Sequence, residues 1–529
     1  GQRAGFDIPL FASQPVLLKL TGQSAATGAV PLPDMTEQYH LRVTKTEIIL
    51  SAATETGILR GLETLLQLAD NGKIAAVNIK DQPRFSWRGL LLDPARRFLP
   101  LPVLKRQIDI MAAVKLNVLH LHLTDDQGWR FESKHFPKLQ QIGGADGFYT
   151  QAELKQLVTY AAERGIRVVP EIDLPGHTTA LGAAYPEFMS QPGPATPEQH
   201  WGVHPAVLDP TNELLYPFLR QLLAEVADVF PDPYLHIGGD EVPHPTKDDP
   251  EHGAWMKSPN CKSVLEKSDY EKTEDLFYYF VDKFSKILAS KGIVTAGWEE
   301  IGMKKEWNEE EEEFVPGVNS AFLNRNFIPY VWNTVWGWGA EDRAYKLANA
   351  GYKVVLSNVN NLYFDLAYDK DPSDPGYYWG GFVDTKTAWG FIPMDIYKGD
   401  LFNNMGAPVN PKDLVNKVRL TPVGAKNILG IQGQLWSETV IGNERMEHYL
   451  FPKMLGLVER AWAKNPSWAS IENETKRKEA MNVSWGEFAA KIGYFEFPKL
   501  SYINGGLNYR IAPPGAKVTD GKLMINHDF

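Results

Sequence analysis

Two adjacent carboxylates follow a short apolar segment in the stretch YLHIGGDEV, residues 234–242. The segment is typical of a buried strand, and two glycines separate it from Asp240 and Glu241. Neighbouring acids repel each other, and burial removes the water that would solvate them. Such a pair lowers the stability of the folded protein and is not expected to be there for structural reasons. Residues 240 and 241 are therefore a candidate site for acid–base chemistry.

Polar and aromatic side chains follow most of the other apolar runs as well. The residues at these ends are Asp93, Arg96, Arg97, Asp125, Asp126, Trp129, Glu171, Asp173, His177, Trp298, Trp332, Tyr363, Asp365, Trp436 and Glu438. A single aspartate here would most often cap the next helix, and a single tryptophan would most often lie in the core. Seven or eight such ends on one face are hard to explain as caps alone.

The residue types at these ends favour one kind of chemistry over others. The sequence contains no HExxH, CxxC or histidine-rich set, so we expect neither a metal nor a cofactor. It contains no GxSxG motif, which argues against a serine hydrolase. Carboxylates beside tryptophans indicate glycoside hydrolysis, because flat aromatic faces stack on sugar rings and paired acids cleave the glycosidic bond.

The elements that must position these residues alternate between short apolar runs and helical patterns. Helical stretches such as 102–115, 151–165 and 214–230 separate most of the runs. Eight strands are predicted at 89–93, 117–123, 167–173, 234–239, 294–298, 329–333, 353–358 and 428–436. This pattern predicts an α/β fold with a (β/α)8 TIM barrel, whose strand ends meet at one face. A doubly wound sheet is the alternative, but no GxGxxG follows a first strand.

Three domains are predicted along the chain. Residues 1–84 form a small α+β N-terminal domain with strands within 39–52 and an amphipathic helix at 57–70. The catalytic barrel covers 85–495, and its long segment 358–428 is expected to be a functional loop. The acidic run 308–314 is expected to be a solvated surface insertion. The tail 496–529 is predicted to be the start of a truncated β domain.

Composition narrows the classes of partner. The 529 residues carry a net charge of −11, which argues against nucleic acid. No run of about 18 apolar residues occurs, so no membrane span is expected. One cysteine, Cys261, permits no internal disulfide. The chain begins at Gly1 without a basic and apolar leader, which fits either a cytosolic protein or one whose signal peptide has been removed.

The motif HIGGDE, together with HLTDDQGW and PEIDLPGH, resembles glycoside hydrolase family 20, the β-N-acetylhexosaminidases and chitobiases. The resemblance extends over roughly residues 38–465. It implies an exo-acting, retaining hydrolase of terminal β-linked GlcNAc or GalNAc. In this family the nucleophile is the 2-acetamido oxygen of the substrate, which closes to an oxazolinium ion. The two adjacent acids therefore need not straddle the sugar ring.

By this resemblance, Glu241 is the general acid that protonates the leaving oxygen and then the base that activates water. Asp240 orients the acetamide and stabilises the positive charge that develops on its nitrogen. We expect Glu241 to be protonated near neutral pH while Asp240 stays charged. Tyr363 matches the tyrosine that hydrogen-bonds the acetamide oxygen. These three residues are the predicted catalytic set.

The resemblance also assigns substrate-binding residues. Four tryptophans surround the sugar, with Trp298, Trp332 and Trp379 as walls around the acetamide methyl group and Trp436 as the floor beneath the ring. Five polar residues complete the set: Arg96 for the O3 and O4 hydroxyls, Glu438 for O4 and O6, Asp365 near O6 or the leaving sugar, and Asp125 with His177 to position Glu241.

Two alternatives to this function remain open on sequence. One is a disaccharide-releasing enzyme of the lacto-N-biosidase type, and the other is a non-catalytic glycan-binding barrel. The resemblance implies an oligosaccharide or glycoconjugate substrate, and hence a periplasmic, outer-membrane-associated or secreted protein. The choice between GlcNAc and GalNAc, the natural polymer and the oligomeric state stay undetermined.

Overall fold

The computed structural model describes residues 16–21, 30–70, 73–245, 249, 252–267, 272–308, 313–527 and 529. At its centre eight parallel strands close into a barrel in the order β7, β8, β9, β10, β11, β14, β15, β16 and back to β7. Their bounds are β7 (Trp87–Leu92), β8 (Val118–His122), β9 (Arg167–Glu171), β10 (Tyr234–His236), β11 (Val294–Trp298), β14 (Ile328–Val331), β15 (Val354–Leu356) and β16 (Ile428–Leu435).

The predicted TIM barrel is therefore confirmed, and each of the eight predicted strands overlaps one observed strand. The strands read as nearly continuous apolar runs because both of their faces are covered. All six residues of β7 are buried, as are all five of β8 and of β9. Parallel strands joined by helices must all end at the same face, so the polar residues after each strand converge there.

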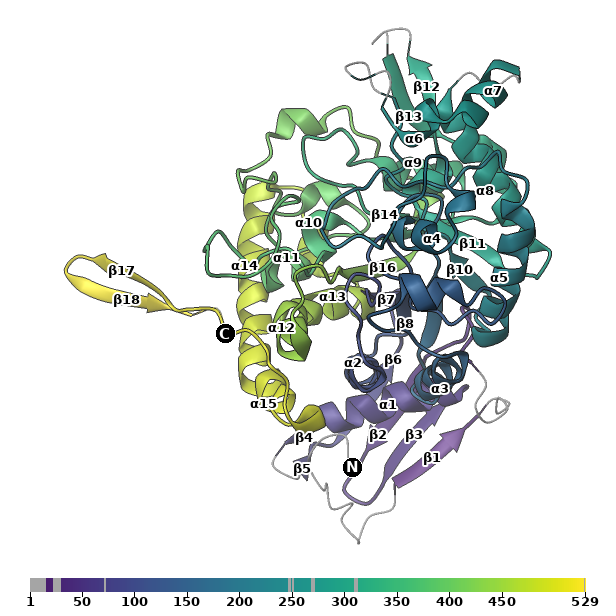
Figure 1. Cartoon of the computed structure of the whole chain (residues 1–529). Helices are drawn as coiled ribbons and strands as arrows, with labels where there is room; N and C mark the ends of the chain where they lie inside the picture. The colour runs from purple at the N-terminus through teal and green to yellow at the C-terminus, as the bar shows by residue number, and fades with distance from the viewer. Residues whose placement is uncertain are drawn as a thin grey trace.

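Fifteen α-helices occur among the described residues, and most of the longer ones cover the barrel (Figure 1). Helix α3 shows how the sequence sets a start, since Thr150 and Glu153 form a capping box. The bounds are α1 (Glu55–Gln67), α2 (Leu101–Ala113), α3 (Gln151–Ala162), α4 (Thr179–Ala184), α5 (Leu215–Val229), α6 (Ala254–Lys257), α7 (Pro259–Lys267), α8 (Thr273–Ala289), α9 (Arg343–Ala350), α10 (Val359–Leu362), α11 (Thr385–Trp389), α12 (Gly442–Leu450), α13 (Lys453–Trp462), α14 (Glu474–Lys491) and α15 (Phe497–Leu500).

A four-stranded sheet packed with α1 precedes the barrel and lies below it in Figure 1. Its strands, in the order β1, β3, β2, β6, have the bounds β1 (Val16–Leu20), β2 (Tyr39–Val43), β3 (Ile48–Ala52) and β6 (Val77–Asp81). Glu37 joins this unit to the barrel, because its carboxylate pairs with Arg60 and Arg88, each at 2.6 Å. Burial opposes the charge, yet the two guanidinium groups lower the pKa of Glu37 to about 2.

Several elements lie outside the barrel and this sheet. They are the short pair β4 (Ala69–Asp70) and β5 (Lys73–Ile74), the hairpin β12 (Met303–Asn308) and β13 (Glu313–Val318), and the hairpin β17 (Gly515–Thr519) and β18 (Lys522–Asn526). Most of the predicted acidic insertion, 309–312, lies outside the described residues. Hairpin β17–β18 is exposed along its length and projects from the body beside α14 (Figure 1). No helix among the described residues is long and apolar enough to span a membrane.

Candidate active site

The two adjacent acids follow a left-handed turn at the end of β10. Gly238, Gly239 and Glu241 have φ values of 66°, 88° and 51°. A Cβ atom on Gly238 would lie 1.6 Å from Asp173 Oδ1, so only glycine fits there. The positive φ at Glu241 is unusual for a residue with a side chain and is a form of strain found at functional sites. The backbone conformation of residues 238–241 thus fixes the positions of Asp240 and Glu241.

His177 faces both acids from the loop after β9. Its Nε2 atom lies 3.8 Å from Asp240 Oδ2 and 3.5 Å from Glu241 Oε2. Its Nδ1 atom lies 3.4 Å from Asp125 Oδ1 and 3.2 Å from Asp126 Oδ2. Burial favours the neutral ring, but the carboxylates of Asp125 and Asp240 raise the pKa of His177 well above its ordinary value. The structure therefore brings together Asp125, His177, Asp240 and Glu241, as the sequence predicts.

The two acids differ in exposure, and burial shifts the pKa of Asp240. The Asp240 side chain is 13% exposed and that of Glu241 is 36% exposed. Burial, reinforced by the charge of Glu241 and opposed by His177, raises the pKa of Asp240 to about 7. The charged form of Asp240 therefore carries a desolvation cost, and its charge at neutral pH stays a prediction. The surrounding segments remove water from Asp240, and this burial cannot be read from its position in the sequence.

Beneath the turn lies a further carboxyl group, Asp173, which was not assigned a role from the sequence. Asp173 Oδ1 accepts the backbone N–H of Gly239 at 3.2 Å. Burial and the neighbouring Asp240 raise the pKa of Asp173 well above its ordinary range. Asp173 thus supports the glycine turn through this hydrogen bond, and its surroundings disfavour a second charge beside Asp240.

Arg96 organises the opposite side of the site. Its guanidinium lies 2.7 Å from Asp125 Oδ2 and 4.7 Å above the Trp436 ring. Arg97 is exposed and donates instead to the backbone oxygen of Glu438 at 2.9 Å. Of the two arginines, Arg96 therefore faces the site, as the resemblance implies.

Two carboxylates, that of Glu438 close to Arg96 and that of Asp365, each have a buried oxygen without a donor among the described residues. These atoms are Glu438 Oε2 and Asp365 Oδ1. Burial raises the pKa of Glu438, although Arg96 opposes the shift. Burial and the charge of Glu438 raise the pKa of Asp365 well above its ordinary range. Buried acceptors of this kind are costly, and hydroxyl donors from a ligand would satisfy them.

The predicted aromatic residues gather around Tyr363. Its ring centroid lies 6.3 Å from that of Trp436 and 6.1 Å from that of Trp379. Trp298 packs 5.7 Å from Trp436, and Trp332 packs 6.2 Å from Trp379. All five predicted aromatics thus form one cluster. Burial raises the pKa of the Tyr363 hydroxyl well above its ordinary value, so this group is a proton donor.

Exposure divides the aromatic cluster into a base and a rim. Trp298 is 1% exposed, whereas Trp379 is 37% exposed. Trp338, which sequence reasoning did not assign, is 52% exposed and stacks on Trp379 at 6.2 Å with an interplanar angle of 28°. Trp379 and Trp338 therefore lie at the rim, and Trp298 lies at the base. The only sequence signal for Trp338 is its closeness to Trp332.

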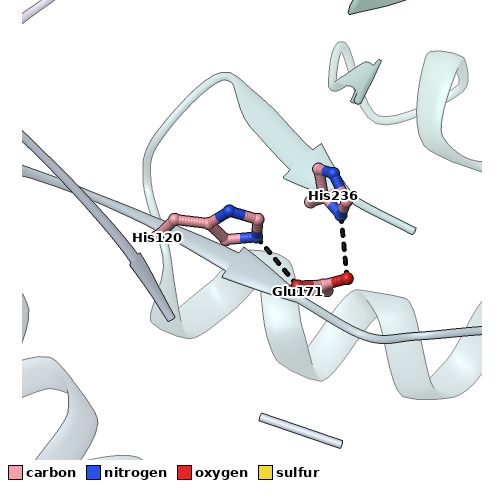
Figure 2. A group of neighbouring side chains, drawn as sticks. All are labelled: His120, Glu171 and His236. Atoms are coloured by element: carbon pink, nitrogen blue, oxygen red, sulfur yellow. Dashed lines mark ion pairs between the residues drawn. The ribbon is translucent and has the colours of Figure 1, made fainter. Parts of the chain in front are cut away.

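A buried set of histidines and one glutamate lies within the barrel, as Figure 2 shows for His120, Glu171 and His236. Glu171 lies 3.0 Å from His120 Nε2 and 3.1 Å from His236 Nδ1. Trp87 Nε1 donates to Gln432 Oε1, which turns the amide nitrogen of Gln432 toward His120 Nδ1 at 2.9 Å. His120 Nδ1 is then an acceptor and its proton is on Nε2, facing Glu171. This arrangement favours a hydrogen-bonded network over a metal site, because a metal would need the Nε2 lone pair.

Glu171 also connects the barrel interior to the acid pair. It accepts hydrogen bonds from Trp298 Nε1 at 3.1 Å and from His122 Nδ1 at 2.7 Å. His122 Nε2 lies 2.8 Å from Asp125 Oδ2. Burial opposes the charge, but Glu171 and Asp125 raise the pKa of His122 well above its ordinary value. The sequence motif HLHL contains this histidine, but its period predicts only a buried strand.

This geometry can be compared with known proteins. A sequence model described as glycosyl hydrolase family 20, catalytic domain, matches residues 85–465. The chain belongs to glycoside hydrolase family 20. Models of domain 2 of this family and of the chitobiase/β-hexosaminidase C-terminal domain match residues 13–82 and 496–529.

Curated relatives and solved structures agree with the family 20 assignment. The chain is 29% identical to a β-hexosaminidase of Vibrio vulnificus over 93% of its length, and 33% identical to one of Vibrio furnissii over 79%. It spans 63% and 64% of the length of these relatives. A family 20 exo-β-N-acetylglucosaminidase of Vibrio harveyi, solved with N-acetylglucosamine, superposes with a TM-score of 0.68 at 28% identity, covering 94% of this chain and 69% of that one.

Proposed function

We propose that this family 20 protein is an exo-acting, retaining glycoside hydrolase that removes terminal β-linked N-acetylhexosamine by substrate-assisted catalysis. The proposal depends most on an oxygen of the Asp240 side chain that is unpaired among the described residues. Its Oδ1 atom is buried beside Glu241 and accepts no hydrogen bond from the described residues. The N–H group of a 2-acetamido substituent is a donor that would satisfy this atom. A sugar without that substituent would leave it unpaired.

The proposed reaction uses the acid pair on different atoms of the sugar. The acetamido oxygen attacks the anomeric carbon while Glu241 gives its proton to the leaving oxygen, and the glycosidic bond breaks. Asp240 accepts a hydrogen bond from the acetamide nitrogen as positive charge develops there. Glu241 then takes a proton from water, the water oxygen attacks the anomeric carbon, and the acetamide is regenerated. Two inversions give net retention.

The tyrosine and tryptophans supply orientation in this proposal. Tyr363 donates a hydrogen bond to the acetamido oxygen and so holds that oxygen near the anomeric carbon. Trp298, Trp332 and Trp379 surround the acetamide methyl group, and Trp436 stacks beneath the sugar ring. Holding the internal nucleophile in a reactive geometry replaces the entropy loss of a bimolecular step, an effect of several kcal/mol.

The ionisation of Asp240 gives the reaction a pH dependence. A carboxylate stabilises the oxazolinium cation better than a neutral acid does, and the pKa of Asp240 is about 7. Activity should therefore rise with pH through this region. The cation that forms on the substrate also favours the charged state of Asp240.

The function is tested by hydrolysis of paired p-nitrophenyl β-GlcNAc and β-glucoside, with an N-acetylglucosamine-thiazoline inhibitor. We expect only the acetamido sugar to be cleaved, and the thiazoline to block its cleavage. Equal cleavage of the plain glucoside would mean that the protein supplies the nucleophile, and the mechanism would be wrong. Cleavage of neither would reject the monosaccharide-releasing activity.

Glu438→Gln is expected to lower kcat/KM for the GlcNAc glycoside by about 10- to 100-fold, mostly through KM. The Glu438 carboxylate is proposed to accept hydrogen bonds from the O4 and O6 hydroxyls, and a hydrogen bond to a charged group contributes about 1.5–3 kcal/mol. Steady-state kinetics on a 4-deoxy substrate provides the control, because part of the loss should disappear there. An equal loss on both substrates would contradict the assignment of Glu438 to O4.

A further inference from the structure

A buried lysine, Lys453, lies at the start of α13. Its side chain is fully buried, and its Nζ atom donates to the backbone oxygens of Phe364 at 2.9 Å and Leu366 at 2.6 Å. The same atom lies 3.8 Å from the ring centroid of Tyr368. Lysine is rarely buried without a carboxylate partner, because desolvation of the ammonium group is costly. The buried position of Lys453 therefore indicates a role for its ammonium group.

The two oxygens that Lys453 binds flank Asp365. The segment that contains them begins at Tyr363, and neither the segment nor its flanks form a regular strand or long helix. On its other side the segment is tied to β16, because the Phe364 N–H donates to the Gln434 backbone oxygen at 2.8 Å. Lys453 therefore supplies the donors for the backbone oxygens of Phe364 and Leu366, which lie outside regular strands.

The charge of Lys453 also acts on Asp365. Burial and Glu438 raise the pKa of Asp365, and Lys453 opposes that shift. Conversely, burial lowers the pKa of Lys453 to about 7, although Asp365, Asp374 and Asp384 work against it. Lys453 is thus charged below about pH 7, and this charge favours the ionised form of Asp365.

Other parts of the chain pack around Lys453 and Asp365. The Tyr368 ring contacts Lys453 and also Arg510 of the C-terminal segment, whose guanidinium carbon lies 4.3 Å from the ring centroid. Arg510 pairs with Asp374 at 2.9 Å. The titratable groups that act on or near Asp365 are Glu438, Lys453, Tyr363, Tyr377 and Tyr449. Among these, Lys453 is the cation.

We propose that Lys453 is a positioning residue for substrate binding, which fixes the backbone on both sides of Asp365 and compensates the charge of its carboxylate. This inference rests on the proposed function, in which Asp365 binds a sugar hydroxyl. Lys453 itself touches no substrate. It acts through Asp365, whose two backbone neighbours it binds.

The first test compares Lys453→Met, Lys453→Gln and Lys453→Arg by kcat and KM across pH on p-nitrophenyl β-GlcNAc. Lys453→Met should lower kcat/KM 10- to 100-fold, mainly through KM, because it removes the donors and the charge. Lys453→Gln keeps N–H donors, so its loss should be smaller. Both should move the acid limb of kcat/KM to higher pH, because Asp365 without its cation is protonated more easily. Lys453→Arg should restore most of the wild-type profile.

Lys115→Met is the matched control. Lys115 is also buried, but it lies beside the N-terminal sheet, where it contacts Thr64 and Tyr39. Burial lowers its pKa to about 8. Its loss should reduce stability without moving the acid limb. If Lys453→Met fails to fold, the comparison of Lys453→Gln with Lys453→Arg tests the same charge.

A double-mutant cycle with Asp365→Asn decides whether Lys453 acts through Asp365. In the Asp365→Asn background, Lys453→Met should change kcat/KM by less than threefold. If the effects of the two substitutions on kcat/KM are fully additive, or if the acid limb of the pH profile does not move, the inference for Lys453 is wrong. The proposed function would still hold in that case, provided that the wild-type protein cleaves the GlcNAc glycoside. If the wild type does not cleave the GlcNAc glycoside, the proposed function fails and the inference falls with it.

Discussion

Glu241→Gln is expected to lower kcat on a GlcNAc disaccharide by about 10²- to 10⁴-fold, which is the range for loss of a general acid–base group. Glutamine has nearly the same shape but can neither give a proton to the leaving oxygen nor take one from water. Glu241 is the more exposed of the two acids and lies 3.5 Å from His177. This position leaves it accessible to a leaving group and to water.

The dependence on the leaving group separates this role from simple misfolding. A p-nitrophenol leaving group needs less protonation than a sugar, so the first step should be less impaired on the aryl glycoside. Burst kinetics can then reveal accumulation of the intermediate, whose hydrolysis still needs a base. Glu187→Gln, which changes an exposed carboxylate, is the control and should not alter kcat. A loss of less than tenfold on the disaccharide would contradict the assignment of Glu241.

Asp240→Asn is expected to lower kcat by about 10²- to 10³-fold, as observed for the loss of one electrostatic stabiliser of a transition state. The amide can still orient the acetamide but carries no charge to oppose the oxazolinium cation. The loss should be largest above pH 7, where the wild-type carboxyl group is ionised. A selective drop in kcat with KM nearly unchanged would fit an interaction made mainly in the transition state.

The same substitution should stabilise the protein at alkaline pH. The pKa of Asp240 is raised from 3.8 to about 7 by folding, so the folded state resists ionisation while the unfolded chain ionises freely. The free energy of unfolding therefore falls as pH rises between these values, and the full penalty applies above pH 7. Asp240→Asn removes it, with an expected gain of about 2–4 kcal/mol at pH 8 and little change near pH 4.

Urea denaturation at pH 4 and pH 8 measures this difference. Asp228→Asn, at an exposed position on α5, is the control and should show no comparable gain. A destabilised Asp240→Asn variant at pH 8 would mean that the ionised carboxylate is stabilised by the fold, contrary to its buried setting. Stability gained together with activity lost is the expected behaviour of a group kept for function.

Much of the architecture was predictable because it depends on local pattern. Buried parallel strands are short apolar runs, and helices between them repeat their apolar residues about every 3.6 positions. These periods located eight strands and the helices α1, α2, α3 and α5. Since strands in such a barrel end at one face, the convergence of the polar ends followed as well.

The individual roles depended on distant contacts that no local pattern encodes. The raised pKa falls on Asp240 because segments from other strands bury it more deeply than Glu241, and their sequence positions alone do not distinguish the two. Trp338 joins the rim only because the loop after β14 meets the one that contains Trp379. Lys453 and Asp365 are 88 positions apart, and only closure of the barrel places the amine against the carbonyls beside that carboxylate. The sequence by itself determined which groups gather at the barrel face, whereas the tertiary structure decided their burial, and burial sets their charge.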